Sequence, residues 1–416
     1  MPKKKGKKKG GKKAKAKVEG AEDIVQSLLK CYERNCTLTD SQMCPGIKNA
    51  LRECKENETV LNRFILEPEP VEKPGDMPVL LEPLLAAFRQ ERYIYITFLH
   101  LWGYPMSYEN AATLGLLLEK GCYPFKCIEL EDCLLEPYSV YRLARSFNHC
   151  SILTTINLDY NEFGDEGCKN LCKGLEGNTT MLSVSMCYCD LTVESGKYLG
   201  GLISSTAVRD LFVDGNNLEC DGLLEIIKTC VEQAKYEAAR RAEEALRKEQ
   251  EELEKAAKEK EGKYKSGGET SGDEGKDKEK KKKKKKGKKK EKEPAAPPPV
   301  GPWIHKLHIA DNGIDGLVYG KEFAPLMMTR TLQELIRFSD CFEELDLEDN
   351  LIGDLAAREI LEALEYRKEH EKLGGVKLRT THRLNADTFN SIVKLGSGLK
   401  KKKKKGKKVR IMHDML

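Results

Sequence analysis

The stretch LTTINLDYNEFGDEGCKNLCKGLEGNT, residues 153–179, places a strand-like segment, a turn and a helix-like segment in succession. Its apolar residues first follow the alternating spacing of a strand, and Asn161 stands where that segment ends. A Gly-Asp-x-Gly turn comes next, and the apolar spacing after it is helical. The stretch therefore predicts a short strand, a tight turn that uses glycine, and a helix that covers the strand.

The same spacing occurs seven times along the chain. Each copy has apolar residues at relative positions 0, 3, 5 and 10 and an Asn or Cys at position 8, which the first copy replaces with Tyr104. The copies begin at Ile96, Phe125, Leu153, Met181, Val208, Ile304 and Phe342. The first five begin 29, 28, 28 and 27 residues apart. A fixed period of this size indicates a solenoid of stacked repeats.

This pattern resembles the leucine-rich repeat, L-x-x-L-x-L-x-x-N/C-x-L. The turns from Asn161 to Gly167 and from Asn350 to Ala356 are similar to those of the ribonuclease-inhibitor class, over roughly residues 93–225 and 303–390. The resemblance implies an α/β solenoid with parallel strands on its concave face and helices outside. No single repeat can bury its own apolar surface, so stacking has to create the core.

Composition divides the remainder of the chain into arms, an extension and an insertion. We expect a helical N-terminal extension and linker at 19–78, with its second helix beginning near Thr39 or Asp40. Residues 229–302 resemble a charged helix followed by a lysine-rich low-complexity insertion, for which a single helix is favoured over a coiled coil because the heptad positions hold mainly alanine. The other expected units are a disordered lysine-rich arm at 1–18, repeats at 79–228 and 303–398, and a lysine-rich tail at 399–416.

The net charge of +5 conceals a division between cationic segments and an acidic body. Lysine-rich stretches at 1–17, 276–293 and 400–410 carry +10, +9 and +9, which leaves −23 for the rest of the chain. Such segments suit acidic surfaces, for example the acidic tails of tubulin. Nucleic acid is possible but not favoured as their partner, because arginine and aromatic residues are almost absent from them.

The sequence contains no catalytic motif, so we predict a protein that is not an enzyme and has no cofactor. A P-loop, G-x-S-x-G and H-E-x-x-H are all absent. Residues 311–322 resemble an EF-hand loop, but the segment before them is strand-like and the repeat pattern accounts for them. We therefore do not expect a calcium site there.

The cysteines indicate a cytoplasmic protein. The chain has 15 cysteines, an odd number, and they are scattered along the sequence, which favours reduced thiols. Cys187 and Cys189 alternate along an expected strand and would share a face, which leaves some room for a metal. No C-x-x-C pair occurs, however, and no metal is predicted. No signal peptide or membrane-length apolar run is present, so we expect no membrane insertion.

The strand positions that do not enter the core should face the concave side and bind a protein partner. These positions combine carboxylates with aromatic side chains, a composition that suits a basic partner. The residues predicted to bind it are Trp102, Glu129, Glu131, Asp159, Tyr160, Tyr188, Phe212, Asp214, Asp346 and Glu348. The alternative is that the acids only keep an unoccupied surface solvated.

The interrupted solenoid as a whole resembles leucine-rich repeat proteins of motile cilia, in which a similar lysine-rich insertion splits the repeats. That resemblance implies a scaffold or adaptor in the cytoskeleton, within the axoneme of a cilium or flagellum, with lysine-rich arms on tubulin or other axonemal proteins. The repeat class also includes activators of the small GTPase Ran, so a GTPase-activating protein is one alternative. A nucleic-acid- or ribosome-associated factor is the other.

Overall fold

The computed structural model describes residues 18–67, 77–264, 300–317, 319–371, 373–381 and 383–396, and in 256–264 only the backbone. Nearly all of the expected N-terminal arm, part of the linker, the low-complexity insertion and the C-terminal tail lie outside the described residues.

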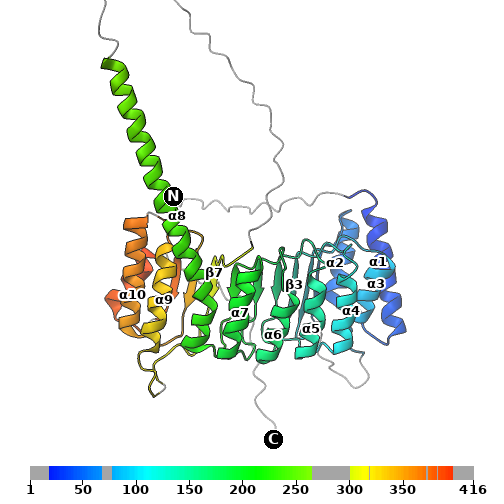
Figure 1. Ribbon diagram of the computed structural model, residues 1–416. Coiled ribbons are helices and arrows are strands. Elements are labelled where there is room, and N and C mark those ends of the chain that lie inside the picture. Colours follow the sequence, from blue (N-terminus) through cyan, green and yellow to red (C-terminus); the bar gives the residue numbers. More distant parts are fainter. Residues whose placement is uncertain are drawn as a thin grey trace, which may run out of the picture.

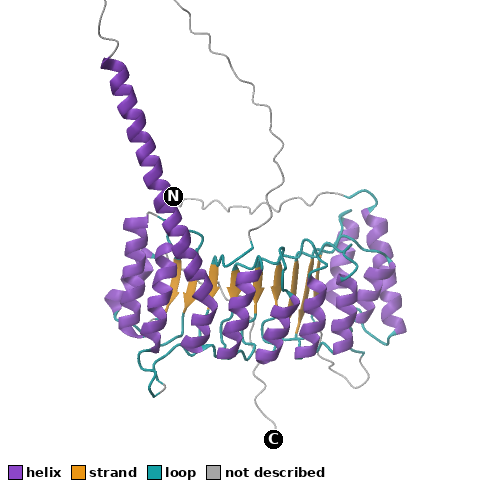
Figure 2. Ribbon diagram, in the orientation of Figure 1, coloured by secondary structure: helices purple, strands orange, loops and turns teal. Residues whose placement is uncertain are grey.

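Nine parallel strands form one sheet in the described chain, and their order in space follows their order in the sequence. Helices cover one face of this sheet, and none of the described helices lies over the opposite face (Figures 1 and 2). The strands are β1 Arg63–Leu66, β2 Phe98–Trp102, β3 Cys127–Glu131, β4 Thr155–Asn157, β5 Ser183–Ser185, β6 Asp210–Phe212, β7 Lys306–His308, β8 Glu344–Leu347 and β9 Lys377–Thr380. The predicted α/β leucine-rich repeat solenoid is thereby confirmed.

The covering layer supplies one α-helix between every pair of successive strands from β1 to β9. The helices are α1 Ala21–Leu38, α2 Pro45–Glu56, α3 Glu82–Gln90, α4 Tyr108–Leu118, α5 Pro137–Phe147, α6 Gly164–Gly174, α7 Val193–Ser205, α8 Glu219–Tyr264, α9 Ala324–Phe338, α10 Gly353–Tyr366 with the π-helical turn Arg367–Glu371, and α11 Ala386–Leu395.

The strands pair in the register that the repeat spacing predicts. Ile128 in β3, for example, lies opposite Leu99 on one side and Ile156 on the other. All three are fully buried, and they belong to one apolar core that runs through the described solenoid. Stacking therefore creates the core, as expected for a repeat that cannot bury its own surface.

Asn161, at the end of its strand, bonds to backbone groups of two repeats. Its Oδ1 accepts hydrogen bonds from the backbone N–H groups of Cys133 and Leu135, 3.0 and 3.1 Å away. Its Nδ2 donates to the carbonyls of Leu130 and Leu158, both at 2.8 Å. This buried side chain thus satisfies the backbone of two repeats where no ladder bond is available.

The expected glycine turns are also present. Gly164 and Gly353 lead into α6 and α10 with φ of 62° and 76°, a left-handed conformation that glycine adopts without steric cost.

The two ends of the solenoid differ from the expected organisation. Instead of further helix, residues Arg63–Leu66 form β1, which pairs with β2 and buries Phe64. The second helix begins at Pro45 and not near Thr39 or Asp40, because Asp40 adopts a left-handed φ of 48° and proline is favoured in a first helical turn. At the other end β9 adds a strand beyond the last recognised copy of the repeat.

The insertion leaves the sheet uninterrupted. β6 and β7 pair directly although residues 213–305 separate them in the sequence. The helix α8 is continuous over 46 residues; its base, including Ile227 and Ala234, is buried on the solenoid. Farther along, Nη2 of Arg241 donates to the carbonyl of Phe338 at 2.6 Å. Beyond this contact α8 projects away from the body (Figure 1).

All 15 cysteines lie within the described residues and are free thiols. Among the helices of the described chain, none combines the length and the apolar character that a membrane crossing requires.

Candidate partner-binding face

The uncovered face of the sheet, here called the strand face, carries the ten residues predicted to bind a partner. Trp102 ends β2 and Glu348 follows β8, six strands away. At about 4.8 Å per strand this separation is about 29 Å along the sheet. The ten residues therefore form neighbouring groups on an extended surface and not one compact site.

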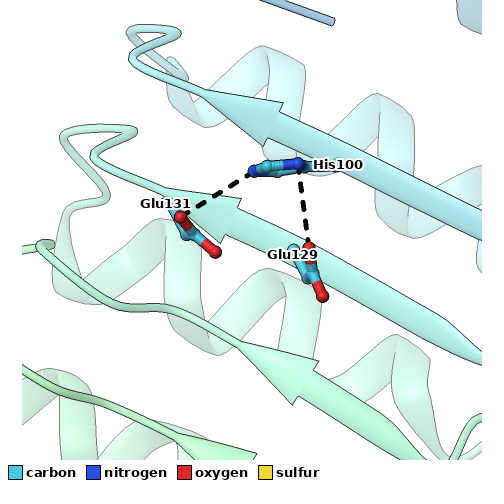
Figure 3. Close-up of side chains that lie close together, drawn as sticks. All are labelled: His100, Glu129 and Glu131. Atoms are coloured by element: carbon cyan, nitrogen blue, oxygen red, sulfur yellow. Dashed lines mark ion pairs between the residues drawn. The ribbon is translucent and has the colours of Figure 1, made fainter. Parts of the chain in front are cut away.

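The first group is centred on His100, which lies between two carboxylates of the neighbouring strand (Figure 3). Its Nδ1 is 3.7 Å from Oε2 of Glu129, and its Nε2 is 3.9 Å from Oε2 of Glu131. The amide Nδ2 of Asn157 donates to Oε1 of Glu131 at 2.9 Å. Trp102, 37% exposed, lies opposite Glu131 in the register of β2 and β3.

This arrangement can hold a positive charge. A protonated His100 would be stabilised by both carboxylates. One ligand atom from each of His100, Glu129 and Glu131 also lies within 4.8 Å of the others, close enough for a divalent cation to draw them together. His100 was not among the residues predicted to bind a partner; its position opposite Glu129 in the repeat register was the available signal.

The second group contains Asp159 and the tyrosines 160 and 188. The tyrosine rings stack with centroids 5.0 Å apart and planes 3° apart, and the residues are 53% and 44% exposed. Oδ1 of Asp159 accepts hydrogen bonds from Oγ of Ser185 at 2.6 Å and from the backbone N–H of Cys187 at 2.8 Å. Burial raises the pKa of Asp159 above its ordinary value.

Both tyrosines belong to a set of equivalent positions, here called the left-handed row, at which the backbone has a positive φ in every repeat from β2 to β8. Its members are Gly103, Asp132, Tyr160, Tyr188, Gly215, Asp311 and Asp349. Glycine adopts this conformation freely and aspartate tolerates it, whereas a bulky residue there is an outlier. The left-handed conformation costs about 1–2 kcal/mol for a residue with a side chain. Tyr160 and Tyr188 therefore carry more backbone strain than the glycine and aspartate residues of the row.

Gly215 is the member of the row that adjoins Tyr188. A Cβ atom added there would lie 2.1 Å from Cε1 of Tyr188, so the tyrosine ring occupies the space beside the glycine. Gly215 was not among the residues predicted from the sequence, because its importance depends on this contact between repeats.

The third group lies at the C-terminal end, where carboxylates are paired with basic side chains. Arg379 in β9 contacts Asp346 and donates to Oε2 of Glu348 at 2.7 Å. Nζ of Lys306 is 2.8 Å from Oδ2 of Asp210, and Lys377 contacts Glu344. Arg379 of the chain itself thus pairs with two of the predicted binding residues, Asp346 and Glu348.

Asp214 and Phe212 connect the second and third groups. Burial, reinforced by the negative charge of Asp346, raises the pKa of Asp214 to about 6. Its Oδ1 accepts a hydrogen bond from the backbone N–H of Ala310 at 2.8 Å. Phe212 packs edge-on against His308, with ring centroids 4.6 Å apart.

Asp214, His308 and Asp346 form a second set of atoms within 4.8 Å that could hold a metal ion. The Arg379 guanidinium already contacts Asp346, however, and its positive charge opposes a cation at that place.

The expectation that Cys187 and Cys189 share a face is wrong, whereas the strand expected before the EF-hand-like segment is present. Cys187 is half-buried on the strand face, but Cys189 is fully buried and its Sγ donates to the carbonyl of Leu158 at 3.2 Å. They do not share a face, because the left-handed Tyr188 between them breaks the alternation. The EF-hand-like segment 311–322 follows the strand β7 and not a helix, and Nδ2 of Asn312 within it donates to the carbonyl of Val213 at 2.9 Å.

Comparisons with known proteins concern the repeats. The family model described as Leucine Rich repeat matches residues 149–172, which include β4 and most of α6. The human protein PRAME family member 10 is 32% identical over 103 residues, which is 24% of this chain and 20% of that relative. The chain thus spans about a fifth of the length of the curated relative it matches. These similarities agree with the leucine-rich repeat fold, whose solenoids generally serve as protein-binding scaffolds.

Proposed function

We propose that this protein is a non-enzymatic scaffold that binds a basic protein partner on the strand face of its solenoid. The observation that carries the proposal is the group of acids and exposed aromatic rings between β3 and β6. There Asp159 accepts from a hydroxyl and a backbone N–H, and Asp214 accepts from a backbone N–H. The negative charge of these two carboxylates can act on a ligand.

The aromatic side chains supply the apolar part of the contact. Tyr160, Tyr188 and Trp102 are each at least 37% exposed. Large aromatic residues of this kind dominate the binding energy of protein interfaces, and surrounding charges fix orientation and increase the rate of association. A rigid sheet that presents both kinds of side chain suits a folded or extended partner with basic groups.

The cellular setting belongs to the same proposal and rests on the resemblance to ciliary leucine-rich repeat proteins. We propose a structural role in the axoneme, in which the lysine-rich segments contact acidic surfaces such as tubulin tails. Those segments lie outside the described residues, and their charge in the sequence supports this part. No observation on the described residues favours the Ran-activator or nucleic-acid alternatives, and they are not carried further.

Site-specific photo-crosslinking in ciliated cells tests the scaffold. A benzophenone amino acid replaces Phe212 on the strand face in one variant and Tyr138, which is 69% exposed on α5, in the matched control. We expect a discrete crosslinked partner from position 212 and none from position 138. Crosslinks from the helical side alone would show that the partner sits on the helices.

The location is tested separately with the tagged, unsubstituted chain. We expect it in isolated axonemes. Its absence from them would remove the ciliary part of the proposal and leave the scaffold intact.

A further inference from the structure

We propose that the stacked pair Tyr160 and Tyr188 binds an arginine side chain, carried by a basic segment of the partner protein. This inference rests on the function proposed above and assigns the chemistry of its central contact. It follows from three observations: the strain at the two tyrosines, the carboxylates beside them, and an arginine–aromatic contact on the same face.

The fold itself does not account for the tyrosines. At the other five positions of the left-handed row the repeats use glycine or aspartate, and the solenoid closes equally well there. The tyrosine rings are about half exposed, and they stack on each other and not into the core. Strained residues of this kind collect at ligand sites, where the surrounding structure holds them in place. The pair is therefore positioned for a contact outside the chain.

Carboxylates surround the rings. Asp159 precedes Tyr160, Asp214 precedes Gly215 beside Tyr188, and Asp311 follows in the same row. Burial raises the pKa of the Tyr188 hydroxyl, and after it the neighbouring Tyr160 and then the negative charges of Asp311 and Asp214 raise it further. The electron-rich faces of two aromatic rings within this negative field attract a cation.

The strand face already contains a contact of the kind proposed. The Arg63 guanidinium in β1 lies 3.8 Å from the centroid of the Phe98 ring in β2. At the other end Arg379 bridges Asp346 and Glu348. A guanidinium combines both contacts, because its plane stacks on a ring while its edge donates to carboxylates. Between β4 and β6 an arginine of the partner would stack on the tyrosine rings and donate hydrogen bonds to Asp159 or Asp214.

Lysine is the competing ligand, since the chain carries many lysines in segments of its own. An ammonium group has no planar surface to stack on a ring. In the described residues the lysine nearest to an aromatic face is Lys169, whose Nζ is 5.9 Å from the centroid of Tyr198. This comparison favours arginine, and it makes the choice between the two cations measurable.

Binding of three synthetic peptides to the full-length protein tests the proposal. The peptides share one Gly/Ser framework and differ only in whether their variable positions hold arginine, lysine or the neutral arginine isostere citrulline. We expect the arginine peptide to bind about threefold more tightly than the lysine peptide and about tenfold more tightly than the citrulline peptide, at low salt.

The matched variants are Tyr160→Gly with Tyr188→Gly, which copies the neighbouring repeats, and Tyr138→Ala on α5 as the control. The double variant should bind the arginine peptide about tenfold more weakly, while its thermal midpoint stays the same or rises because the left-handed strain is gone. The control should bind like the wild type. Equal affinity of the wild type and the double variant would overturn the proposal, as would a lysine peptide that binds as tightly as the arginine peptide.

If the double glycine variant folds poorly, a second double variant, Asp159→Asn with Asp214→Asn, tests the arginine site instead, because it keeps both tyrosines. Unchanged affinity of this variant for the arginine peptide would overturn the proposal. Failure here is distinguishable from failure of the scaffold function: a tyrosine-pair variant that still crosslinks its partner from position 212 retains the scaffold and loses only the arginine site.

Discussion

The two halves of the strand face have the same backbone and use their carboxylates differently. From β7 to β9, basic residues of the chain itself, Lys306, Lys377 and Arg379, contact the acids of neighbouring strands. From β3 to β6, Glu131 and Asp159 are held by amides, hydroxyls and backbone N–H groups. The left-handed row adds tyrosines only in this first half.

This difference shows how a repeat fold separates stability from binding. In the C-terminal half, ion pairs join adjacent strands, and their charge is used within the molecule. In the N-terminal half Asp159 and Asp214 accept hydrogen bonds from a hydroxyl and from backbone N–H groups, and two strained tyrosines lie beside them; this is the part of the face proposed to bind a ligand. The core beneath both halves is the same, so the strand face can change its use without a change of fold.

The largest effect should come from the shared core. Leu158→Ala in the first half and Leu347→Ala in the second remove equivalent buried side chains, and each should lower the free energy of unfolding by about 2–5 kcal/mol. Urea denaturation measures this. Leu355→Ala, at a position 58% exposed on α10, is the control and should have little effect. An unchanged urea midpoint for either buried variant would mean that the register of that repeat is misassigned.

The next effect should separate the halves. Arg379→Met leaves the Asp346 side chain, only 2% exposed, without its guanidinium. Removing one partner of a buried ion pair costs about 3–5 kcal/mol; here the backbone N–H of Glu348 still donates to Asp346, so we expect about 2–3 kcal/mol.

Arg63→Met, which removes a cation–π contact with Phe98 in the first half, serves as the comparison and should cost about 1 kcal/mol or less. Equal costs for the two arginines, again from urea denaturation, would remove the proposed difference in how the halves use charge.

A smaller effect should depend on pH. The pKa of Asp214 is raised to about 6, so the folded protein holds this proton more tightly than the unfolded chain does. Stability from this group is therefore greatest below the unfolded pKa, about 4, falls as pH rises to about 6, and stays low above it. Asp214→Asn should raise the free energy of unfolding by about 1–2 kcal/mol at pH 7.5.

That gain should disappear near pH 4, which denaturation curves at the two pH values can measure. If Asp214→Asn is no more stable than the wild type at pH 7.5, then burial of the ionised Asp214 carboxylate does not destabilise the folded protein.

The smallest effect should come from the border between the halves. Deleting residues 243–298 and inserting a flexible Gly/Ser linker keeps Arg241 and the buried base of α8. Because β6 and β7 pair directly, the free energy of unfolding should change by less than about 0.5 kcal/mol. A deletion that also removes residues 227–242 is the contrast and should destabilise the protein, since it exposes the core beneath α8. Loss of the cooperative thermal transition in the shorter deletion would make the insertion part of the core.

The repeats were predictable because stacking imposes one spacing on every copy. The ends were harder, since a capping unit faces the next repeat on one side only. The repeat spacing does fit its first three apolar positions to Leu61, Phe64 and Leu66, but the proline-rich residues after them end the pattern. The match to the repeat spacing is weaker at β9 than at β1, because Thr380 stands at a position that is apolar in the other repeats.

The positions on the strand face were also predictable, whereas their partners were not. Asp346 and Glu348 resemble ligand-binding acids in the sequence, because the strand that carries Arg379 was not recognised. The strain at Tyr160 and Tyr188 had a signal: glycine or aspartate fills the same position in the other repeats. Which acids of the strand face are paired with basic side chains of the chain itself depends on contacts between strands, and these appear only in three dimensions.

The direct pairing of β6 with β7 also determines what happens while the chain is being made. Only 24 residues separate β5 from β6 in the sequence, whereas 93 residues separate β6 from β7. At about 5–20 residues per second, the ribosome needs about 1–5 s for the first interval and about 5–19 s for the second. While residues 213–305 are being synthesised, β6 is an open edge of the sheet, and such edges pair with other chains. We therefore expect association between nascent chains to be concentrated in those whose synthesis has stopped just short of residue 306.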